Sequence, residues 1–509
     1  MKFVGTWALA TFACCAPIAS NAVAGATHFE GLADAPFVDG RPTAETAIKL
    51  QRELAFQQAT QAYLWAMPLI NTLGMKFGSD AAFGTGYNVL PIWKDRLDPK
   101  TLVTTPNSDV IYAMSYVDLS ETGPLVFDAP SDMQGILLDF WQRPIPVDGG
   151  KYFGDVGFAG PDHGKGGKFL ILPPGYDGDV PEGYFVYRSG TNNIFIFLRS
   201  FFKDPKNLAP AVELIERSQI YPLNSTPAER KPMQFPNASG VPADMLPRSD
   251  FSAFEQLKWL VDREGKHLAS ADGLGLLANV GLIAGKPFKP DAATKSMLNA
   301  AAKTAYKTSR VIGLQDGIAG ESYKVWADRQ WINPVNNAKY PGPEKPSTLA
   351  FENKAGGFYE IEPRVWFFTN YYSISPGMVS QKAGQGAAYE IAFNDADGKP
   401  LLGKHAYKVT LPPNIPAEIF WSLTLYNAAN ASGLPTAERR FPSLGSRDNP
   451  KFNADGSIDL YIGPNAPEGK EDNWLPTAAD KGFFAILRLY GPKESAIDYS
   501  WKPGDFERQ

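Results

Sequence analysis

The two cysteines of this chain, Cys14 and Cys15, stand side by side in a stretch that is typical of a secretory signal peptide. Lys2 is the one charge in this stretch, an apolar run follows it, and Ala22-Val23-Ala24 is a small-x-small cleavage signal. Cleavage after Ala24 would leave a chain without cysteine. Such a chain cannot form disulfides, cysteine–metal sites or a thiol nucleophile, so we expect large aromatic-rich cores and subunit contacts to stabilise it.

The same segment predicts export, to the periplasm or out of the cell. A lipid anchor is the alternative, but it needs a leucine-like residue three positions before a cysteine, where this chain has Thr11 and Phe12. No second apolar run of about 18 residues follows, so we expect no transmembrane segment. A formal net charge of −5 over 509 residues lacks the basic excess of a nucleic-acid-binding protein, so we expect no nucleic-acid partner.

The spacing of apolar residues divides the rest of the chain into helical and strand-rich stretches. Residues 41–77 and 206–312 repeat apolar side chains at helical spacing, whereas residues from about 100 to 200 and the last third alternate as strands do. An aromatic content of 13% and 43 prolines also favour strands and loops over a helical bundle. We therefore predict an α+β, β-rich fold, with two β-sandwich or jelly-roll-like domains and a helical segment between them. The predicted boundaries are 1–24 for the signal peptide, 41–200 for the N-terminal domain with its leading helix, 201–335 for the helical connection and 336–509 for the C-terminal β-sandwich.

The two faces of the predicted strand 483–490 differ in character. One face is wholly apolar, and the other carries Arg488 and Tyr490 at its end. Because side chains alternate along a strand, we expect the first face in a core and the second on a half-open surface. Arg488 is therefore a candidate ligand contact.

Three segments resemble metal or nucleotide sites, but each lacks residues that such a site requires. The turns at Asp397-Gly398 and Asp455-Gly456 lack the ligand spacing of a calcium loop and are interpreted as hairpin turns. Residues 160–165 resemble a phosphate loop, but the loop is one residue short and Gly166 stands where a serine or threonine would bind magnesium. We therefore predict no metal and no cofactor.

A first group of candidate site residues lies at the end of the predicted strand 136–141. Asp139 shares a strand face with Leu137 and Trp141, and Arg143 follows two residues later. A carboxylate on such a face needs a partner, so a structural Asp139–Arg143 pair is one interpretation. The other is a ligand site in which Asp139 is a base, Arg143 binds an anion and Trp141 contacts the ligand.

A second group lies in residues 104–109 and the strand that follows. Asn107 and Asp109 suit an Asx turn that leads into the strand. The alternative is that Asn107, Asp109 and Tyr112 contact a ligand. Further along, His163 stands in a glycine-rich loop, where an imidazole could serve in catalysis.

Several of these segments resemble a known pair of families. Residues 105–112 and 123–126 are similar to the domain of unknown function numbered 1254. The C-terminal part resembles its usual companion, numbered 1214, through five elements in the right order: residues 420–427, 455–457, 473–476, 488–492, and Trp501 with Pro503. The resemblance spans most of residues 45–503. It implies the long bacterial exported branch, two β-rich domains and a homo-oligomer, and it implies no reaction.

Three functions remain open from the sequence. The first is an exported protein that binds a small molecule or glycan through aromatic side chains and a few polar anchors. The second is a hydrolase or lyase with Asp139 as base and His163 as acid, in which Arg143 and Asn107 anchor the substrate. The third is a structural, envelope-associated oligomer. Whether Asn107, Asp139, Arg143 and Arg488 line one cavity is the observation that separates them best.

Overall fold

A computed structural model describes residues 27–318, 321–333, 351–353, 357–378 and 382–509. The predicted signal peptide, with Cys14, Cys15 and the cleavage signal at Ala24, lies outside the described residues. The chain divides into two compact units, Met1–Ala55 and Phe56–Gln509, and each is described by itself. No helix in the described part of the chain is long and apolar enough to cross a membrane.

The described part of the first unit, residues 27–55, is mostly exposed. A capping box between Thr27 and Glu30 begins α1 (His28–Ala33), because each side chain accepts a hydrogen bond from the other residue's backbone. A two-stranded hairpin follows, formed by β1 (Phe37–Val38) and β2 (Arg41–Pro42). The helix α2 (Ala44–Trp65) then begins and runs on into the second unit.

Two helices take the place of the single helix predicted for residues 41–77. The first, α2, ends at Trp65, and α3 (Met67–Phe83) begins after Ala66 with Pro68 in its first turn. Proline suits that position because its missing N–H has no partner in the first turn of a helix.

The N-terminal half of the second unit contains two four-stranded sheets that share a core. Side chains at alternate positions of the inner sheet, such as Ile111, Ile196 and Leu198, pack against Phe127 and Phe169 of the outer sheet. The inner sheet has the order β4 (Ile111–Asp118), β10 (Asn193–Ser200), β6 (Gln134–Asp139) and β7 (Asp155–Val156). The outer sheet has the order β11 (Gln219–Pro222), β5 (Leu125–Ala129), β8 (Gly167–Leu172) and β9 (Phe185–Arg188).

The C-terminal half repeats this arrangement with two further four-stranded sheets. The apolar face predicted for residues 483–490 is confirmed, since Phe483, Ala485, Leu487 and Leu489 all lie in the core of this half. The inner sheet has the order β17 (Ala387–Ala392), β23 (Phe483–Pro492), β19 (Ala417–Asn427) and β20 (Ser443–Gly445). The outer sheet has the order β22 (Trp474–Pro476), β21 (Ile458–Gly463), β18 (Tyr407–Leu411) and β24 (Glu507–Arg508).

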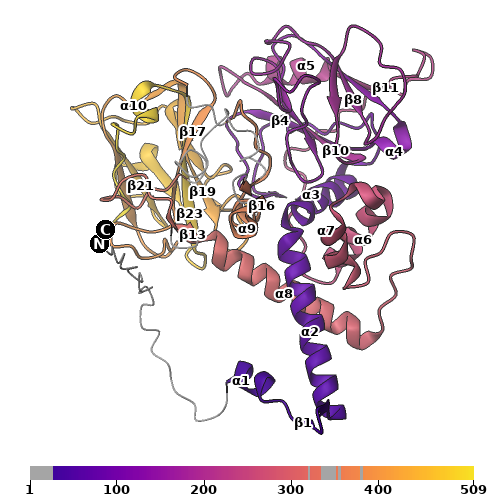
Figure 1. The fold of residues 1–509 in the computed structure, drawn as a ribbon. Helices are drawn as coiled ribbons and strands as arrows, with labels where there is room; N and C mark the ends of the chain where they lie inside the picture. Colours follow the sequence, from indigo (N-terminus) through magenta and orange to yellow (C-terminus); the bar gives the residue numbers. More distant parts are fainter. Residues whose placement is uncertain (1–26, 319–320, 334–350, 354–356, 379–381) are drawn as a thin grey trace, which may run out of the picture. The chain divides into compact units, whose positions relative to one another are not determined.

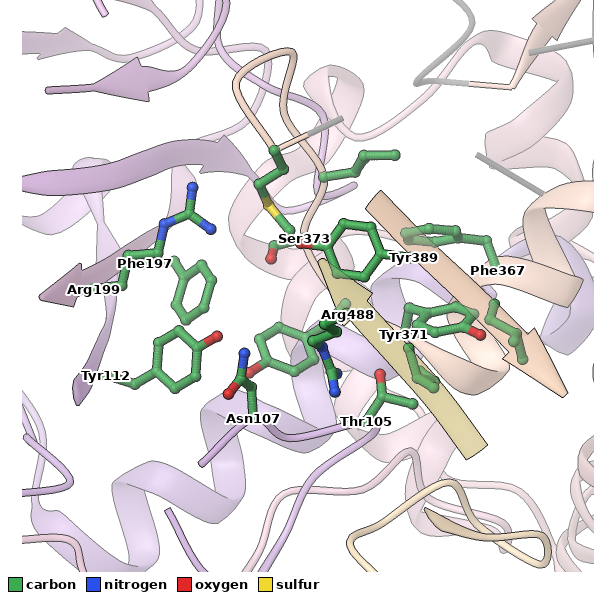
Figure 2. A pocket seen from close by; sticks show the side chains of 15 residues that line it. Thr105, Asn107, Tyr112, Phe197, Arg199, Phe367, Tyr371, Ser373, Tyr389 and Arg488 are labelled. Atoms are coloured by element: carbon green, nitrogen blue, oxygen red, sulfur yellow. The ribbon is translucent and has the colours of Figure 1, made fainter. Parts of the chain in front are cut away.

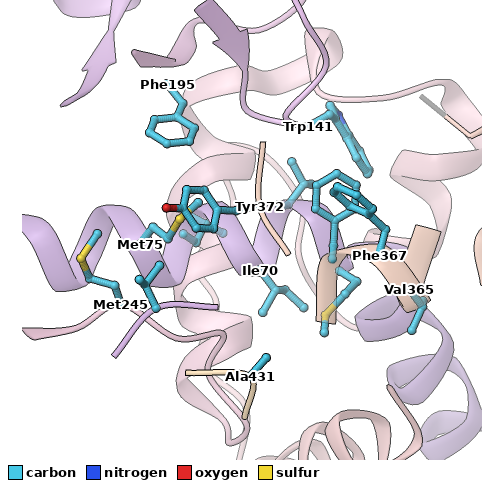
Figure 3. Packing of buried hydrophobic residues seen from close by; sticks show 14 of the residues in the cluster. Ile70, Met75, Trp141, Phe195, Met245, Val365, Phe367, Tyr372 and Ala431 are labelled. Atoms are coloured by element: carbon cyan, nitrogen blue, oxygen red, sulfur yellow. The ribbon is translucent and has the colours of Figure 1, made fainter. Parts of the chain in front are cut away.

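A third and larger core joins the two inner sheets to the helices (Figure 3). It includes Phe195 of β10 and Ile486 of β23, together with Ile70 of α3 and Phe367 of α9. Each inner sheet is therefore buried on both faces. The helices that surround this core are the part of α2 from Phe56 onward, α3, α6 (Ser252–Glu264), α7 (Ala271–Ala278), α8 (Ala292–Gly313) and α9 (Ile361–Asn370) (Figure 1).

The predicted α+β, β-rich class is confirmed. Antiparallel pairing dominates the four main sheets, and helices cover one face of each of the two inner sheets. The remaining elements are short: α4 (Leu119–Thr122), α5 (Ala209–Glu216), α10 (Glu494–Ile497), β3 (Thr101–Leu102), β12 (Ala243–Asp244), β13 (Gly317–Ile318), β14 (Glu321–Ser322), β15 (Glu352–Asn353) and β16 (Phe358–Tyr359).

Candidate functional site

Each of the two inner sheets places an arginine beside a tyrosine. Both pairs lie on the sheet face that packs into the third core, between the sheets and the helices. In the N-terminal half, Arg199 of β10 lies opposite Tyr112 of β4. In the C-terminal half, Arg488 of β23 lies opposite Tyr389 of β17. Side chains directly opposite each other on paired strands are in contact range, so each sheet presents a cationic and phenolic pair.

These two pairs line one inner cavity of about 80 Å³ (Figure 2). Tyr112 and Arg199 come from one sheet, and Tyr389 and Arg488 come from the other. Most of the remaining wall is aromatic or aliphatic. The other lining residues are Thr105, Asn107, Phe197, Phe367, Tyr371, Tyr372, Ser373, Ile374, Met378, Ile391 and Ile486.

Arg488 is the charged group at the centre of this cavity. It is 4% exposed, and its Nη1 atom has no hydrogen-bond partner within the described residues. No carboxylate of the described residues lies within ion-pair distance of its guanidinium. A buried cation without an anion is costly, because protein of low polarity replaces its water. The cavity therefore favours an anion.

The tyrosines around Arg488 are neutral hydrogen-bond donors. Burial raises the pKa of Tyr112 and of Tyr371 above the usual value for tyrosine, so both hydroxyls keep their protons. The Tyr371 hydroxyl has no hydrogen-bond partner among the residues that the structure describes. An anion beside Arg488 would thus meet hydroxyl donors as well as a guanidinium.

A larger outer cleft of about 700 Å³ adjoins the inner cavity. Arg199 and Met378 line both spaces. Three exposed apolar side chains, Phe158, Phe201 and Ile419, also line the cleft. The two spaces together therefore suit a molecule with an anionic end and an apolar body.

Asp155 is the buried carboxylate of the outer cleft, and it is 4% exposed. The Ser375 hydroxyl donates to its Oδ1 at 2.6 Å, and the backbone N–H of Gly377 donates to its Oδ2 at 2.9 Å. Burial raises the pKa of Asp155 to about 6, although these two bonds and the charge of Arg199 act to lower it. Asp155 can therefore change its protonation state near neutral pH.

The predicted Asx turn at Asn107 is confirmed. The side-chain oxygen of Asn107 accepts from the backbone N–H of Asp109 at 2.6 Å, and its amide donates to the Tyr490 hydroxyl. The Ser422 hydroxyl donates to Asp109 Oδ2 at 2.6 Å, so Asp109 joins the two halves and does not line the inner cavity. This loop and the opposite sheet cover the strand face that carries Arg488 and Tyr490, so that face is buried. The prediction that it would form a half-open surface is therefore wrong.

Strain in the backbone accompanies this turn. Thr105 has a φ of +38° and lines the inner cavity. Few β-branched residues adopt a positive φ, and such conformations cluster at functional sites. The Thr105 hydroxyl donates to the carbonyl of Asn370 at 2.9 Å, which holds the strained residue in place.

The other sequence-predicted residues lie elsewhere. Asp139 forms the structural pair with Arg143, whose Nε lies 2.7 Å from Asp139 Oδ2 and whose backbone N–H donates to Oδ1 at 2.9 Å. Trp141 and Arg143 line a separate cavity. His163 is exposed, lines the outer cleft and contacts the Tyr152 hydroxyl at 3.2 Å. The structure thus brings Asn107, Tyr112 and Arg488 together, whereas His163 lines only the outer cleft and Asp139 lines none of the three spaces.

Arg199, Tyr389 and Asp155 are residues of the site that were not predicted from the sequence. Arg199 follows the apolar run 194–198 just as Arg488 follows the apolar run 483–487, so the same sequence signal was present before Arg199. Asp155 gave no signal, because its role depends on burial beneath Ser375 and Gly377, which are more than 200 residues away. Among the described residues, no group of three or more histidine, cysteine, aspartate or glutamate side chains could hold a metal ion.

Comparisons with known proteins agree with this division into halves. A model of the family DUF1254, of unknown function, matches residues 87–222, and a model of DUF1214, also of unknown function, matches residues 386–494. The chain thus carries one match to each of the two families. The paired resemblance expected from the sequence is therefore confirmed. In these terms, the DUF1254 region supplies Tyr112 and Arg199 to the inner cavity, and the DUF1214 region supplies Tyr389 and Arg488.

One solved structure shares the fold at low sequence identity, and a second match is weaker. The VPA0106 protein from Vibrio parahaemolyticus is 17% identical, with a TM-score of 0.50, and the match covers 89% of this chain and 100% of that one. An uncharacterized protein from Burkholderia cenocepacia is 11% identical, with a TM-score of 0.38, over 91% of this chain and 95% of that one. No curated protein matches the chain. The homo-oligomer stays a prediction.

Proposed function

We propose that the protein binds a small organic carboxylate, with the carboxylate in the inner cavity and an apolar body in the outer cleft. The observation that carries this proposal is Arg488, a buried guanidinium without a carboxylate partner in the described part of the chain. Arg199, at the junction of the two spaces, supplies a second cation. A planar guanidinium matches a carboxylate through two parallel hydrogen bonds.

A neutral glycan fits this site less well than a carboxylate. Sugars need many polar anchors around their hydroxyl groups, whereas most of the inner wall is aromatic or aliphatic. The apolar side chains Phe158, Phe201 and Ile419 favour a hydrocarbon or aromatic body in the cleft. Of the ligand classes left open by the sequence, the geometry therefore supports a small molecule with one negative charge.

Replacing Arg488 by methionine should weaken the binding of carboxylates about 100-fold, because a charge-assisted bidentate contact contributes roughly 2 to 3 kcal/mol. Acetate, benzoate, 3-phenylpropanoate and decanoate would be screened by thermal shift, each with its uncharged amide, and the best binder measured by calorimetry. Arg488→Lys keeps the charge but not the fork, so we expect a loss of about 10-fold.

The control is Arg188→Met, at an exposed ion pair with Asp148 outside both spaces. It should bind as the wild type does. Equal shifts for acids and amides, or wild-type affinity in a folded Arg488→Met protein, would refute the proposal.

Carboxylate affinity should fall as the pH rises through about 6. Asp155 gains its negative charge in this range and would repel an anion in the adjoining cleft. Asp155→Asn should make the affinity nearly independent of pH between 5 and 8. His163 lines the same cleft, so His163→Gln is the matched control, and it should leave most of the pH dependence in place. A wild-type affinity that is flat across this range would contradict the role of Asp155.

A hydrolase or lyase is the second candidate function. The observation that favours it is the presence of Asp155 and His163 in one cleft beside Arg199, since a carboxyl group that titrates near 6 can accept or donate a proton at neutral pH. The test is turnover of carboxylate-bearing esters and 3-hydroxy acids. Turnover that survives in Asp155→Asn would remove this candidate.

We also propose that the protein is exported, to the periplasm or out of the cell. The support is the sequence of residues 1–24, with its apolar run and its cleavage signal at Ala24. Cell fractionation and N-terminal sequencing test this directly. A mature protein that begins at Gly25 is expected, and cytoplasmic protein that retains residues 1–24 would overturn it.

A further inference from the structure

A separate cavity of about 180 Å³ lies beside the third core. It shares no lining residue with the inner cavity or the outer cleft. The helix α9 contributes to the inner cavity and to this separate cavity, because Phe367 lines the inner cavity and the next residue, Phe368, lines the separate one. The other lining residues are Trp65, Trp141, Arg143, Leu268, Ala269, Ser270, Phe351, Tyr359 and Arg364.

Arg364 on α9 is the unmatched charge of this cavity. It is 6% exposed, and its Nε atom has no hydrogen-bond partner in the described residues. Its Nη2 atom donates to the backbone carbonyl of Trp65 at 2.6 Å, which fixes the guanidinium but supplies no charge. No carboxylate within the described ranges lies within ion-pair distance of it.

The second arginine of the cavity does not change this balance. Arg143 is already paired with Asp139 at 2.7 Å. Burial, the largest cause, and the positive charge of Arg143 lower the pKa of Arg364 to about 10, although Tyr359 acts to raise it. Two guanidinium groups therefore face one carboxylate, and the cavity keeps one excess positive charge.

The walls of the cavity are aromatic. The rings of Trp65 and Trp141 meet edge to face with centroids 5.0 Å apart. The guanidinium carbon of Arg364 lies 5.3 Å from the centroid of Trp141 and 6.0 Å from that of Tyr359. The Trp141 indole N–H is already bonded to the carbonyl of Leu268 at 2.7 Å, so this ring offers an apolar surface. Such walls favour a flat, apolar group next to the excess cation.

We propose that this cavity is a second binding site, for an aromatic carboxylate whose charge pairs with Arg364 and whose ring packs against Trp65 and Trp141. The site needs none of the residues of the inner cavity. A ligand here would contact Arg364 and Phe368 of α9, whereas Phe367 of the same helix lines the inner cavity, so both sites would bear on α9.

The experiment uses 4-bromobenzoate and the full mature chain. Calorimetry should show two sites on the wild type. Arg364→Met should abolish binding at one site, about a 100-fold loss, and leave the other within twofold. Arg488→Met should weaken binding only at the inner cavity and leave the site at Arg364 unchanged. Crystals soaked in 4-bromobenzoate should give an anomalous bromine peak between Trp65, Trp141 and Arg364.

A second variant covers the case in which Arg364→Met does not fold. Ala269 lines the cavity without bearing charge, and Ala269→Met would fill part of it while leaving both arginines in place. It should remove the same site. The proposal is overturned if the bromine occupies only the inner cavity, or if folded Arg364→Met or Ala269→Met binds as the wild type does. A peak in this cavity alone would support this site and count against the inner one.

Discussion

Glu390→Gln should make the protein more stable than the wild type at pH 7 and above. Glu390 lies on β17, on the face that packs into the core of the C-terminal half, and is 2% exposed. The Asn333 amide donates to its Oε1 at 3.4 Å, and its Oε2 has no hydrogen-bond partner in the described part of the chain. Burial raises the pKa of Glu390 to about 8, and the Asn333 bond lowers it by less.

The sign of the pH effect follows from this raised pKa. The unfolded chain would lose this proton near pH 4.5, whereas the folded protein holds it until about pH 8. The contribution of Glu390 to stability is therefore fully present below about pH 4.5 and is lost as the pH rises through about 8. Glutamine resembles the protonated acid and does not titrate, so the advantage of Glu390→Gln should grow over this window to about 3 to 5 kcal/mol.

Urea unfolding at pH 5, 7 and 9 measures this difference. The control is Glu468→Gln, at an exposed position, which should change the free energy of unfolding by less than about 0.5 kcal/mol at every pH. A difference between Glu390→Gln and the wild type that stays constant from pH 5 to 9 would show that Glu390 is not protonated in the folded protein.

Local pattern was enough to predict the class of the fold. The alternation in residues 483–490 assigned every side chain of that strand to the correct face, because a buried sheet face imposes a period of two. Helical spacing also located the leading helices. It merged α2 and α3 into one, because the periodicity continues across Ala66 and only the backbone there departs from it.

The candidate site was predictable only in halves. Asn107, Tyr112 and Arg488 were each notable from their own segment, but Asn107 and Arg488 are 381 positions apart (488 − 107). Their meeting depends on how the two inner sheets pack, and a single sequence carries no signal for that pairing. Asp139 and Arg143 were also predicted from their own segment, but they form an ion pair with each other and do not line the inner cavity.

Gly78→Ala should destabilise the protein by about 3 kcal/mol, although alanine is normally about 1 kcal/mol better than glycine in a helix. Gly78 lies on α3, where the chain at β12 crosses it very closely. A Cβ atom at this position would lie 2.2 Å from the carbonyl oxygen of Asp244 and 2.9 Å from the Cα of Met245. Both contacts are with backbone, so neither can be relieved by turning a side chain, and α3 or β12 must move.

Movement of α3 would reach the two proposed binding sites. The Asn71 amide of α3 donates to the carbonyl of Phe368 on α9 at 3.0 Å, and the Thr72 hydroxyl donates to the carbonyl of Phe140 at 3.1 Å. The Asn71 bond holds α9, which supplies Phe367 to the inner cavity and Arg364 to the separate cavity. Gly78→Ala should therefore weaken carboxylate binding as well as stability, without altering any lining residue.

The matched control is Gly275→Ala on α7, where an added Cβ would have no atom within 4 Å. Only helix propensity acts there, so this variant should gain up to about 1 kcal/mol. Denaturant unfolding of both variants separates the two effects, since the same substitution should change stability in opposite directions. If Gly78→Ala gained stability as Gly275→Ala does, the close approach of α3 to β12 would not exist in solution, and the Asn71 bond to α9 would not depend on it.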